Sequence, residues 1–254
     1  MHTNQQCKPN TASLATENKQ TLVHWSSKES QARLHSSNHK QDFFELSMHY
    51  QSQENKMFCG VASVAIILNA LRMNKENAQI PLDTSTVGCD EMAYMPEGFC
   101  PHWNRYTQRN VLAKSPKSRI EVFGKPHALN GDNKENYGLT IYELADLIEC
   151  NGAIATPVEC KDLPNYEQRK QDLIKVLDTP DQYIIAHFSR PALNQNGNGH
   201  LSPLVAYDQD SDSFLLMDTN TMSNNWVWID ANKLLEAMNT FDNPYWRGYM
   251  VVSD

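Results

Sequence analysis

The chain has 254 residues, which is long enough for one large domain or two small ones with a sizeable core. Its 22 Lys and Arg against 30 Asp and Glu give a formal net charge of −8, which argues against non-specific nucleic-acid binding, because that binding needs cations to neutralise phosphates. No apolar run approaches the roughly 20 residues that span a bilayer, and no secretory signal is visible. We therefore expect neither nucleic-acid nor membrane partners, and a cytoplasmic location by default.

The first half of the chain contains one pronounced apolar element. Residues 1–41 form a polar lead-in that we expect to be partly mobile, with a short strand predicted at 21–25. The nearly continuous apolar run over 61–71 favours a helix buried all round, because its three alanines suit a helix and it lacks the alternation of a strand. Residues 74–138 predict long loops with short helices near 105–112.

The second half predicts regular elements that end in a sheet. A helix is expected over 140–149, where Thr140 and Glu143 stand at the capping-box spacing. The other predicted elements are a strand at 153–159, helices at 166–177 and 232–239, and strands at 183–188, 201–207, 213–217, 226–229 and 248–252. Helices that precede an antiparallel sheet indicate an α+β fold.

The number of cysteines is even, which would allow three disulfides. The chain is much longer than the small secreted scaffolds for which that inference is safe. No Cys-x-x-Cys pair occurs, so a structural zinc site has little support. Cys89, Cys100 and His102 are close in the sequence, but their spacing differs from that of a zinc knuckle, and we predict no metal ligand.

Cys59 differs from the other cysteines because it directly precedes the predicted buried helix. The N-terminus of a helix presents the positive end of the helix dipole and unpaired N–H groups, and both favour the thiolate, which is the nucleophilic form. The alternative is a small core residue on a hydrophobic helix. The partners of Cys59 decide between the two.

Three further residues complete a candidate catalytic group. His200 follows Cys59 by about 140 residues, the separation found in papain-type cysteine proteases. Asp218 ends the next predicted strand, and it shares a face with His200 if the hairpin pairs even with even residues, so that its carboxylate would orient the imidazole. Gln53 stands where papain-like enzymes place the side-chain donor of the oxyanion hole, with the Cys59 N–H as second donor. Taken alone, each residue also has an interpretation without a catalytic role. His200 could be an exposed histidine of a loop, and Asp218 could simply end a strand.

The amino-acid sequence around these residues resembles that of the phytochelatin synthase family from about residue 42 to residue 252, with gaps. The matching phrases are Asp-Phe-Phe-Glu-Leu-Ser-Met at 42–48, Phe-Cys-Gly-Val-Ala-Ser at 58–63, Leu-Asn-Ala-Leu at 68–71, Gly-His-Leu-Ser-Pro-Leu at 199–204, Leu-Met-Asp at 216–218 and Glu-Ala-Met-Asn-Thr at 236–240. The resemblance implies a papain-like catalytic domain over 42–254, with a helical N-terminal lobe that holds the nucleophile helix and a C-terminal antiparallel sheet lobe. It resembles the short bacterial form of the family.

The resemblance also implies acyl transfer on glutathione. Cys59 would attack the carbonyl of the Cys–Gly bond, and His200 would activate the thiol and then protonate the leaving glycine, giving a γ-Glu-Cys thioester. A second glutathione would accept the acyl group to give a phytochelatin, or water would release γ-Glu-Cys. No covalent cofactor is expected, and cadmium or zinc would stimulate transfer as glutathione thiolate complexes. The oligomeric state stays open, with a homodimer among the options.

Glutathione carries two carboxylates, so its site needs cations. Arg190 and Arg247 stand where members of the family keep an arginine near the acyl group, although each also suits an exposed strand end. Thr221 replaces an arginine of the family, which puts acceptor binding in doubt. Two other functions stay open. One is a papain-like peptidase or deamidase for a protein substrate, and the other is a non-enzymatic, thiol-rich protein that sequesters metal or serves in protein interaction.

Overall fold

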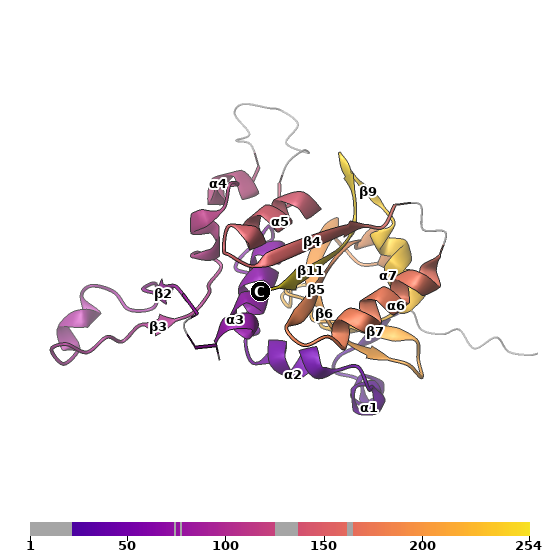
Figure 1. The fold of residues 1–254 in the computed structure, drawn as a ribbon, viewed down its shortest axis with the longest axis horizontal. Coiled ribbons are helices and arrows are strands. Elements are labelled where there is room, and N and C mark those ends of the chain that lie inside the picture. Colours follow the sequence, from indigo (N-terminus) through magenta and orange to yellow (C-terminus); the bar gives the residue numbers. More distant parts are fainter. Residues whose placement is uncertain (1–21, 74, 77, 125–136, 162–164) are drawn as a thin grey trace, which may run out of the picture.

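The computed structural model describes residues 22–254 except residues 74, 77, 125–136 and 162–164, and its centre is a seven-stranded sheet (Figure 1). The strand order is β1-β8-β7-β6-β5-β11-β4, and all neighbours run antiparallel. The strands are β1 (Leu22–His24), β4 (Ile154–Glu159), β5 (Gln182–Ser189), β6 (Gly199–Asp208), β7 (Ser213–Leu216), β8 (Val227–Asp230) and β11 (Gly248–Ser253). The predicted antiparallel sheet is therefore confirmed, within a mixed α and β fold.

Helices cover both faces of this sheet. One core contains α3 (Cys59–Arg72) and α5 (Ile141–Glu149), and the other contains α6 (Tyr166–Leu177) and α7 (Ala231–Met238). The apolar residues of β5 alternate between the two cores, with odd positions facing α3 and even positions facing α6 and α7. The central strands are therefore apolar on both sides, as in other sheets that are buried between helices.

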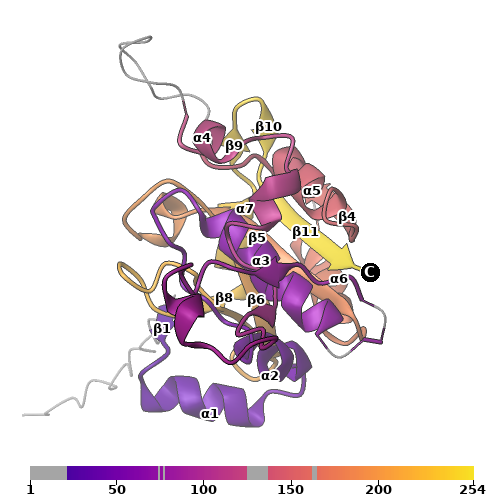
Figure 2. The ribbon, with the colours of Figure 1, turned by 90° about the vertical axis from the view of Figure 1, so that its left-hand side faces the viewer.

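The buried helix predicted over 61–71 is α3, and it begins at Cys59. All its residues are buried except Cys59 and Ala70, which explains why its sequence shows no polar face. Gly60 lies against β6, since a Cβ atom at this position would come within 2.8 Å of a Leu201 methyl group. Figure 2 looks onto α3, with α1 (Lys28–Ser36) and α2 (Gln41–Ser47) below it.

Two of the predicted helices have the expected bounds. Thr140 caps α5, and the reciprocal hydrogen bonds with Glu143 form the predicted capping box. Helix α6 spans the predicted residues and is capped by Asn165. These boundaries were predictable because capping involves residues that are neighbours in the sequence.

The polar lead-in expected for residues 1–41 folds onto the sheet from Leu22 onward. Strand β1 pairs with β8, in agreement with the short strand predicted there, and Val23 is buried. In α1, Ser30 is fully buried and its hydroxyl accepts a hydrogen bond of 3.1 Å from the indole N–H of Trp228. Strand β1 and helix α1 thus pack on the sheet although they precede residue 42, the predicted start of the catalytic domain. Residues 1–21 lie outside the described part.

A loop projects from the body of the molecule between α3 and α5 (Figure 1). Its base is a short antiparallel pair, β2 (Leu82–Asp83) with β3 (Trp103–Asn104), and it carries the turn η1 (Glu91–Tyr94). Cys89 and Cys100 are exposed and unpaired within it. In the described residues, no three His, Cys, Asp or Glu side chains are grouped so that they would hold a metal ion.

The remaining short elements lie outside the large sheet. They are η2 (Val111–Lys114), α4 (Arg119–Val122), η4 (Pro191–Leu193) and the hairpin of β9 (Phe241–Asp242) with β10 (Tyr245–Trp246). Of these, η4 and the β9–β10 hairpin contribute residues to the cavity described below. None of the helices in the described part of the chain is long and apolar enough to cross a membrane.

Candidate active site

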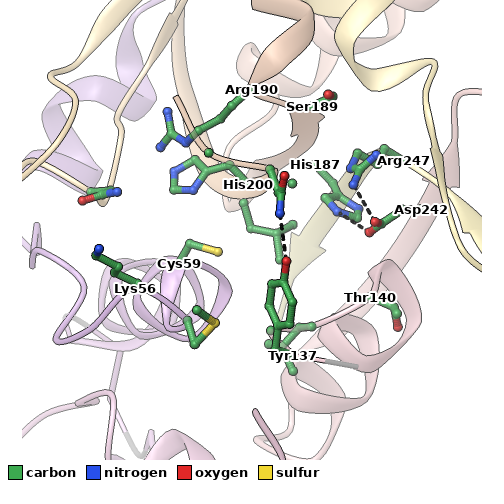
Figure 3. A pocket seen from close by; sticks show the side chains of 18 of the residues that line it. Lys56, Cys59, Tyr137, Thr140, His187, Ser189, Arg190, His200, Asp242 and Arg247 are labelled. Carbon is green, nitrogen blue, oxygen red and sulfur yellow. Dashed lines mark hydrogen bonds and ion pairs between the residues drawn. The ribbon is translucent and has the colours of Figure 1, made fainter. Parts of the chain in front are cut away.

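Cys59 lines a cavity of about 950 Å³ at the N-terminal end of α3 (Figure 3). Segments that are far apart in the sequence form its wall, from the approach to α3, the start of α5, the β5–β6 connection and the β9–β10 hairpin. All five predicted residues that face a ligand line it, namely Gln53, Cys59, Arg190, His200 and Arg247. Asp218 is fully buried behind His200.

His200 is held by two buried oxygen atoms. Its Nε2 lies 2.8 Å from Asp218 Oδ1 and 2.8 Å from Ser202 Oγ. Because Nε2 faces these partners, Nδ1 is the ring nitrogen that remains for Cys59. The ring also packs edge-on against Phe188, with 5.6 Å between the ring centroids. The imidazole thus has one orientation, in which a carboxylate lies behind it and a thiol in front.

A β-bulge places His200 and Asp218 on one face of the hairpin. Near the turn, β6 and β7 pair even with odd residues, as in Ala206 with Leu215. The register shifts between Leu204 and Ala206, after which Leu204 pairs with Leu216. The condition of even-with-even pairing is thereby met at the end that carries the site. Without the shift, the side chain of Asp218 would point to the face opposite His200.

Arg190 is the second cation on Asp218, which differs from its predicted role. Its guanidinium Nη2 donates to Asp218 Oδ1 and Oδ2 at 3.0 and 2.8 Å, and its Nη1 donates to Gln195 at 2.8 Å. Arg190 was expected to offer its charge to a substrate carboxylate, but the carboxylate of the same protein occupies it. The sequence shows no pattern that pairs residues 28 apart, each of them just beyond the end of a strand.

The electrostatics of the site favour charged forms. Burial alone would raise the pKa of Asp218, but His200, Arg190 and the backbone N–H of Asn220 lower it to about 2. Burial also favours a neutral thiol and a neutral imidazole. Their mutual contact outweighs it, so the pKa of Cys59 is lowered, and the pKa of His200, which Asp218 also stabilises as the cation, is raised. Both shifts favour the thiolate–imidazolium pair over the neutral thiol and imidazole.

Gln53 lies in the wall of the same cavity as Cys59. Its Nε2 donates one hydrogen bond to the Asn55 carbonyl at 2.7 Å, and its Oε1 accepts from Thr219 at 3.3 Å. An amide nitrogen has two hydrogens, so one remains for a ligand. The backbone N–H groups at the start of α3 are the natural second donors, because a helix leaves them unpaired.

A second polar cluster is formed by His187, Asp242 and Arg247. It lies on the side of Cys59 away from Lys56 (Figure 3). Asp242 binds Arg247 Nη2 at 2.5 Å and His187 Nε2 at 3.3 Å. Among the described residues, Arg247 Nε and His187 Nδ1 are buried without a hydrogen-bond partner. Buried polar atoms of this kind ordinarily find a partner, so this side of the cavity suits a ligand with polar ends.

Sequence reasoning predicted Arg247 but missed its two partners and other lining residues. Ser202 had a usable signal, because residues two apart in a strand share a face and it follows His200 by two. His187 and Asp242 had none, since they lie on β5 and β9 and meet only through folding. Lys56, Lys117 and Tyr137 also line the cavity.

A family model described as phytochelatin synthase matches residues 14–82 and 94–249. The interval without a match, 83–93, lies in the projecting loop. The match covers most of the chain, in agreement with the resemblance seen in the sequence.

Curated proteins that resemble this chain at low sequence identity agree with the family match. Glutathione gamma-glutamylcysteinyltransferase 3 of Lotus japonicus is 25% identical over 213 residues, which are 83% of this chain and 37% of that protein. Glutathione gamma-glutamylcysteinyltransferase 1 of Triticum aestivum is 23% identical over 83% of this chain and 36% of its own length. The Schizosaccharomyces pombe glutathione gamma-glutamylcysteinyltransferase is 22% identical over 84% and 43%. The chain thus spans less than half the length of these relatives.

Proposed function

This chain belongs to the phytochelatin synthase family, and from that premise we propose that it is a papain-like γ-glutamylcysteinyltransferase that acts on glutathione. In this proposal Cys59 is the nucleophile, His200 the acid–base, Asp218 its orienting carboxylate and Gln53 an oxyanion donor. The observation that carries it is a buried Asp218–His200 pair aimed at a thiol with a lowered pKa inside one cavity. Residues 42–254 would form the papain-like catalytic domain, and β1 and α1 would stabilise it by packing on its sheet.

The first half-reaction makes a thioester. The Cys59 thiolate attacks the carbonyl carbon of the Cys–Gly bond, and the oxyanion that forms accepts hydrogen bonds from Gln53 and the Cys59 N–H. The imidazolium of His200 gives its proton to the glycine nitrogen as the C–N bond breaks. Glycine leaves, and γ-Glu-Cys stays bound to the sulfur as a thioester.

The second half-reaction returns the thiol. Neutral His200 takes a proton from the incoming nucleophile, which is either water or the α-amine of another glutathione. Attack on the thioester carbonyl expels the thiolate and releases γ-Glu-Cys or γ-Glu-Cys joined to the acceptor. Asp218 stabilises the imidazolium in both halves, and Arg190 acts through Asp218 as a positioning residue.

The second polar cluster suits the γ-glutamyl head of the donor. That head carries an α-carboxylate and an α-ammonium group. Arg247 can donate to the carboxylate through its unpartnered Nε–H, and Asp242, which holds the Nη2 of Arg247, can accept from the ammonium group. Heavy-metal ions such as cadmium or zinc enter this proposal only as thiolate complexes of glutathione, that is, as substrate, so the reaction steps need no resident metal.

Mass spectrometry of the products from glutathione tests the proposal. Wild type should release glycine with γ-Glu-Cys, or form chains longer than γ-Glu-Cys, and cadmium should increase the share of chains. Cys59→Ala should lose both products by at least a thousandfold, because Cys59 is the only thiol among the described residues of the cavity wall. Cys150→Ala is the matched control, since Cys150 lies outside the cavity. Glycine release by Cys59→Ala would contradict the proposal.

A further inference from the structure

Lys56 is an exposed cation at the wall of the cavity, three residues before Cys59. The other lysine of the wall, Lys117, binds Glu143 at 3.0 Å. Glu54, the carboxylate nearest to Lys56 in the sequence, faces Arg119 at 3.7 Å. Within the described residues no ion pair to Lys56 is formed, so its ammonium group can meet an anion from solution.

The position of Lys56 relative to the second polar cluster indicates which part of a substrate it meets. In Figure 3 Lys56 lies on one side of Cys59, and Arg247 and Asp242 lie on the other. If the acyl group extends from the sulfur toward Arg247 and Asp242, the leaving group extends toward Lys56. The wall near Lys56 is therefore the side from which glycine departs and the acceptor arrives.

The leaving glycine and the amine end of the acceptor glutathione have the same arrangement of an amine next to a carboxylate. Glycine leaves as an α-amino acid, with its carboxylate separated from the scissile nitrogen by a single carbon. An acceptor glutathione attacks through the α-amine of its γ-glutamyl residue, whose α-carboxylate is also one carbon away. One cation close to the nucleophile can thus bind the carboxylate of both, and a lysine supplies it as a point charge.

We propose that Lys56 forms an α-carboxylate subsite that binds first the leaving glycine and then the α-amino acid end of the acceptor. The proposal rests on the proposed function and adds the specificity of its second half-reaction. The acceptor class is then any small molecule with a free amine and an adjacent carboxylate.

Exchange of isotopically labelled glycine into glutathione tests this directly. Labelled glycine attacks the thioester and regenerates glutathione, whereas labelled glycinamide gives glutathione amide and lacks the carboxylate. We expect Lys56→Ala to slow exchange of glycine about tenfold at subsaturating concentration, because a charged contact is lost at a solvent-exposed site. Exchange of glycinamide should change less than about twofold.

Matched variants separate charge from structure. Lys56→Arg should keep most of the preference for glycine over glycinamide, while Lys56→Gln should lose it. Lys114→Ala removes another exposed lysine, outside the cavity, and should leave both exchange rates unchanged. A preference for glycine that survives in Lys56→Ala would overturn the subsite, as would an equal loss of both exchange reactions.

The donor provides an independent measurement. Wild type should have a lower KM for glutathione than for its C-terminal amide, and Lys56→Ala should raise the KM for glutathione alone while kcat changes little. Failure of the subsite is distinguishable from failure of the proposed function. In the first case wild type and Lys56→Ala release glycine with the same selectivity, and in the second case wild type releases no glycine.

Discussion

Asp218 shows how a single buried carboxylate organises the site. It accepts hydrogen bonds from His200, from Arg190 and from the backbone N–H of Asn220, so an otherwise costly buried charge is compensated. Its negative charge in turn favours the imidazolium form of His200, and that imidazolium favours the thiolate of Cys59. The reactivity of the thiol therefore depends on a residue that never contacts it.

His200→Ala should change the pH dependence of Cys59 alkylation. Burial raises the pKa of Cys59, and His200 lowers it together with backbone hydrogen bonds from Leu201 and Gly60. Removal of His200 leaves only the two backbone bonds against burial, so the apparent pKa should move up. At pH 7 the thiolate fraction, and with it the rate of alkylation by iodoacetamide, should fall at least tenfold. Peptide-resolved mass spectrometry over pH 5–10 measures the rate.

Cys150 is the internal control in that experiment. Its pKa is raised, chiefly by burial, so it should react slowly at neutral pH in both proteins. A Cys59 profile that is the same with and without His200 would show that the two side chains are not coupled.

At the scale of elements, two glycines let backbone segments approach closely, and they differ in what a methyl group would meet. At Gly248 in β11, a Cβ atom would lie 1.9 Å from the Val158 carbonyl oxygen of the paired strand. At Gly60 in α3, the nearest atoms are methyl groups of Leu201, Leu139 and Leu144. Side-chain ends can move aside, whereas a paired backbone cannot.

Gly248→Ala should therefore destabilise the protein more than Gly60→Ala. We expect a loss of about 3 kcal/mol or more for the former and about 1 kcal/mol for the latter in the free energy of unfolding by urea. Gly60→Ala should nevertheless reduce glycine release from glutathione, because it moves the helix that carries Cys59 relative to β6. A larger loss of stability for Gly60→Ala would contradict this ranking.

At the scale of the whole molecule, the N-terminal segment completes the sheet. Strand β1 covers the edge of β8, and Trp25 packs against Trp226 with 5.2 Å between ring centroids. Ser30 of α1 satisfies the buried indole N–H of Trp228. None of these described residues lines the cavity, so their contribution is to stability rather than to chemistry.

A chain shortened to residues 42–254 should therefore melt at a lower temperature than one that begins at residue 22. We expect a decrease in Tm of about 5 °C or more, because an apolar edge and a buried N–H group lose their partners. Differential scanning calorimetry measures it. Glycine release per folded molecule should stay the same at low temperature, and an unchanged Tm would support a boundary at residue 42.

Patterns between neighbouring residues were sufficient for much of this protein. The capping box of α5, the bounds of α6 and the buried run of α3 follow from local periodicity and capping. The spacing of Cys59, His200 and Asp218, with their motifs, predicted three residues that the structure brings together, the first two in the cavity wall and Asp218 behind His200. Such signals are readable because each depends on a few residues that are close in the chain or on a recurrent order.

Only the tertiary structure shows the register between strands and the pairing of charged side chains. The shift between Leu204 and Ala206 leaves no mark in the hydrophobic pattern, yet it places Asp218 on the face of His200. Whether Arg190 would face a substrate or Asp218 depended on the packing of two strands. The free cation at Lys56 likewise became visible only beside its paired neighbours, because electrostatic partners are chosen by proximity in space and not by separation along the chain.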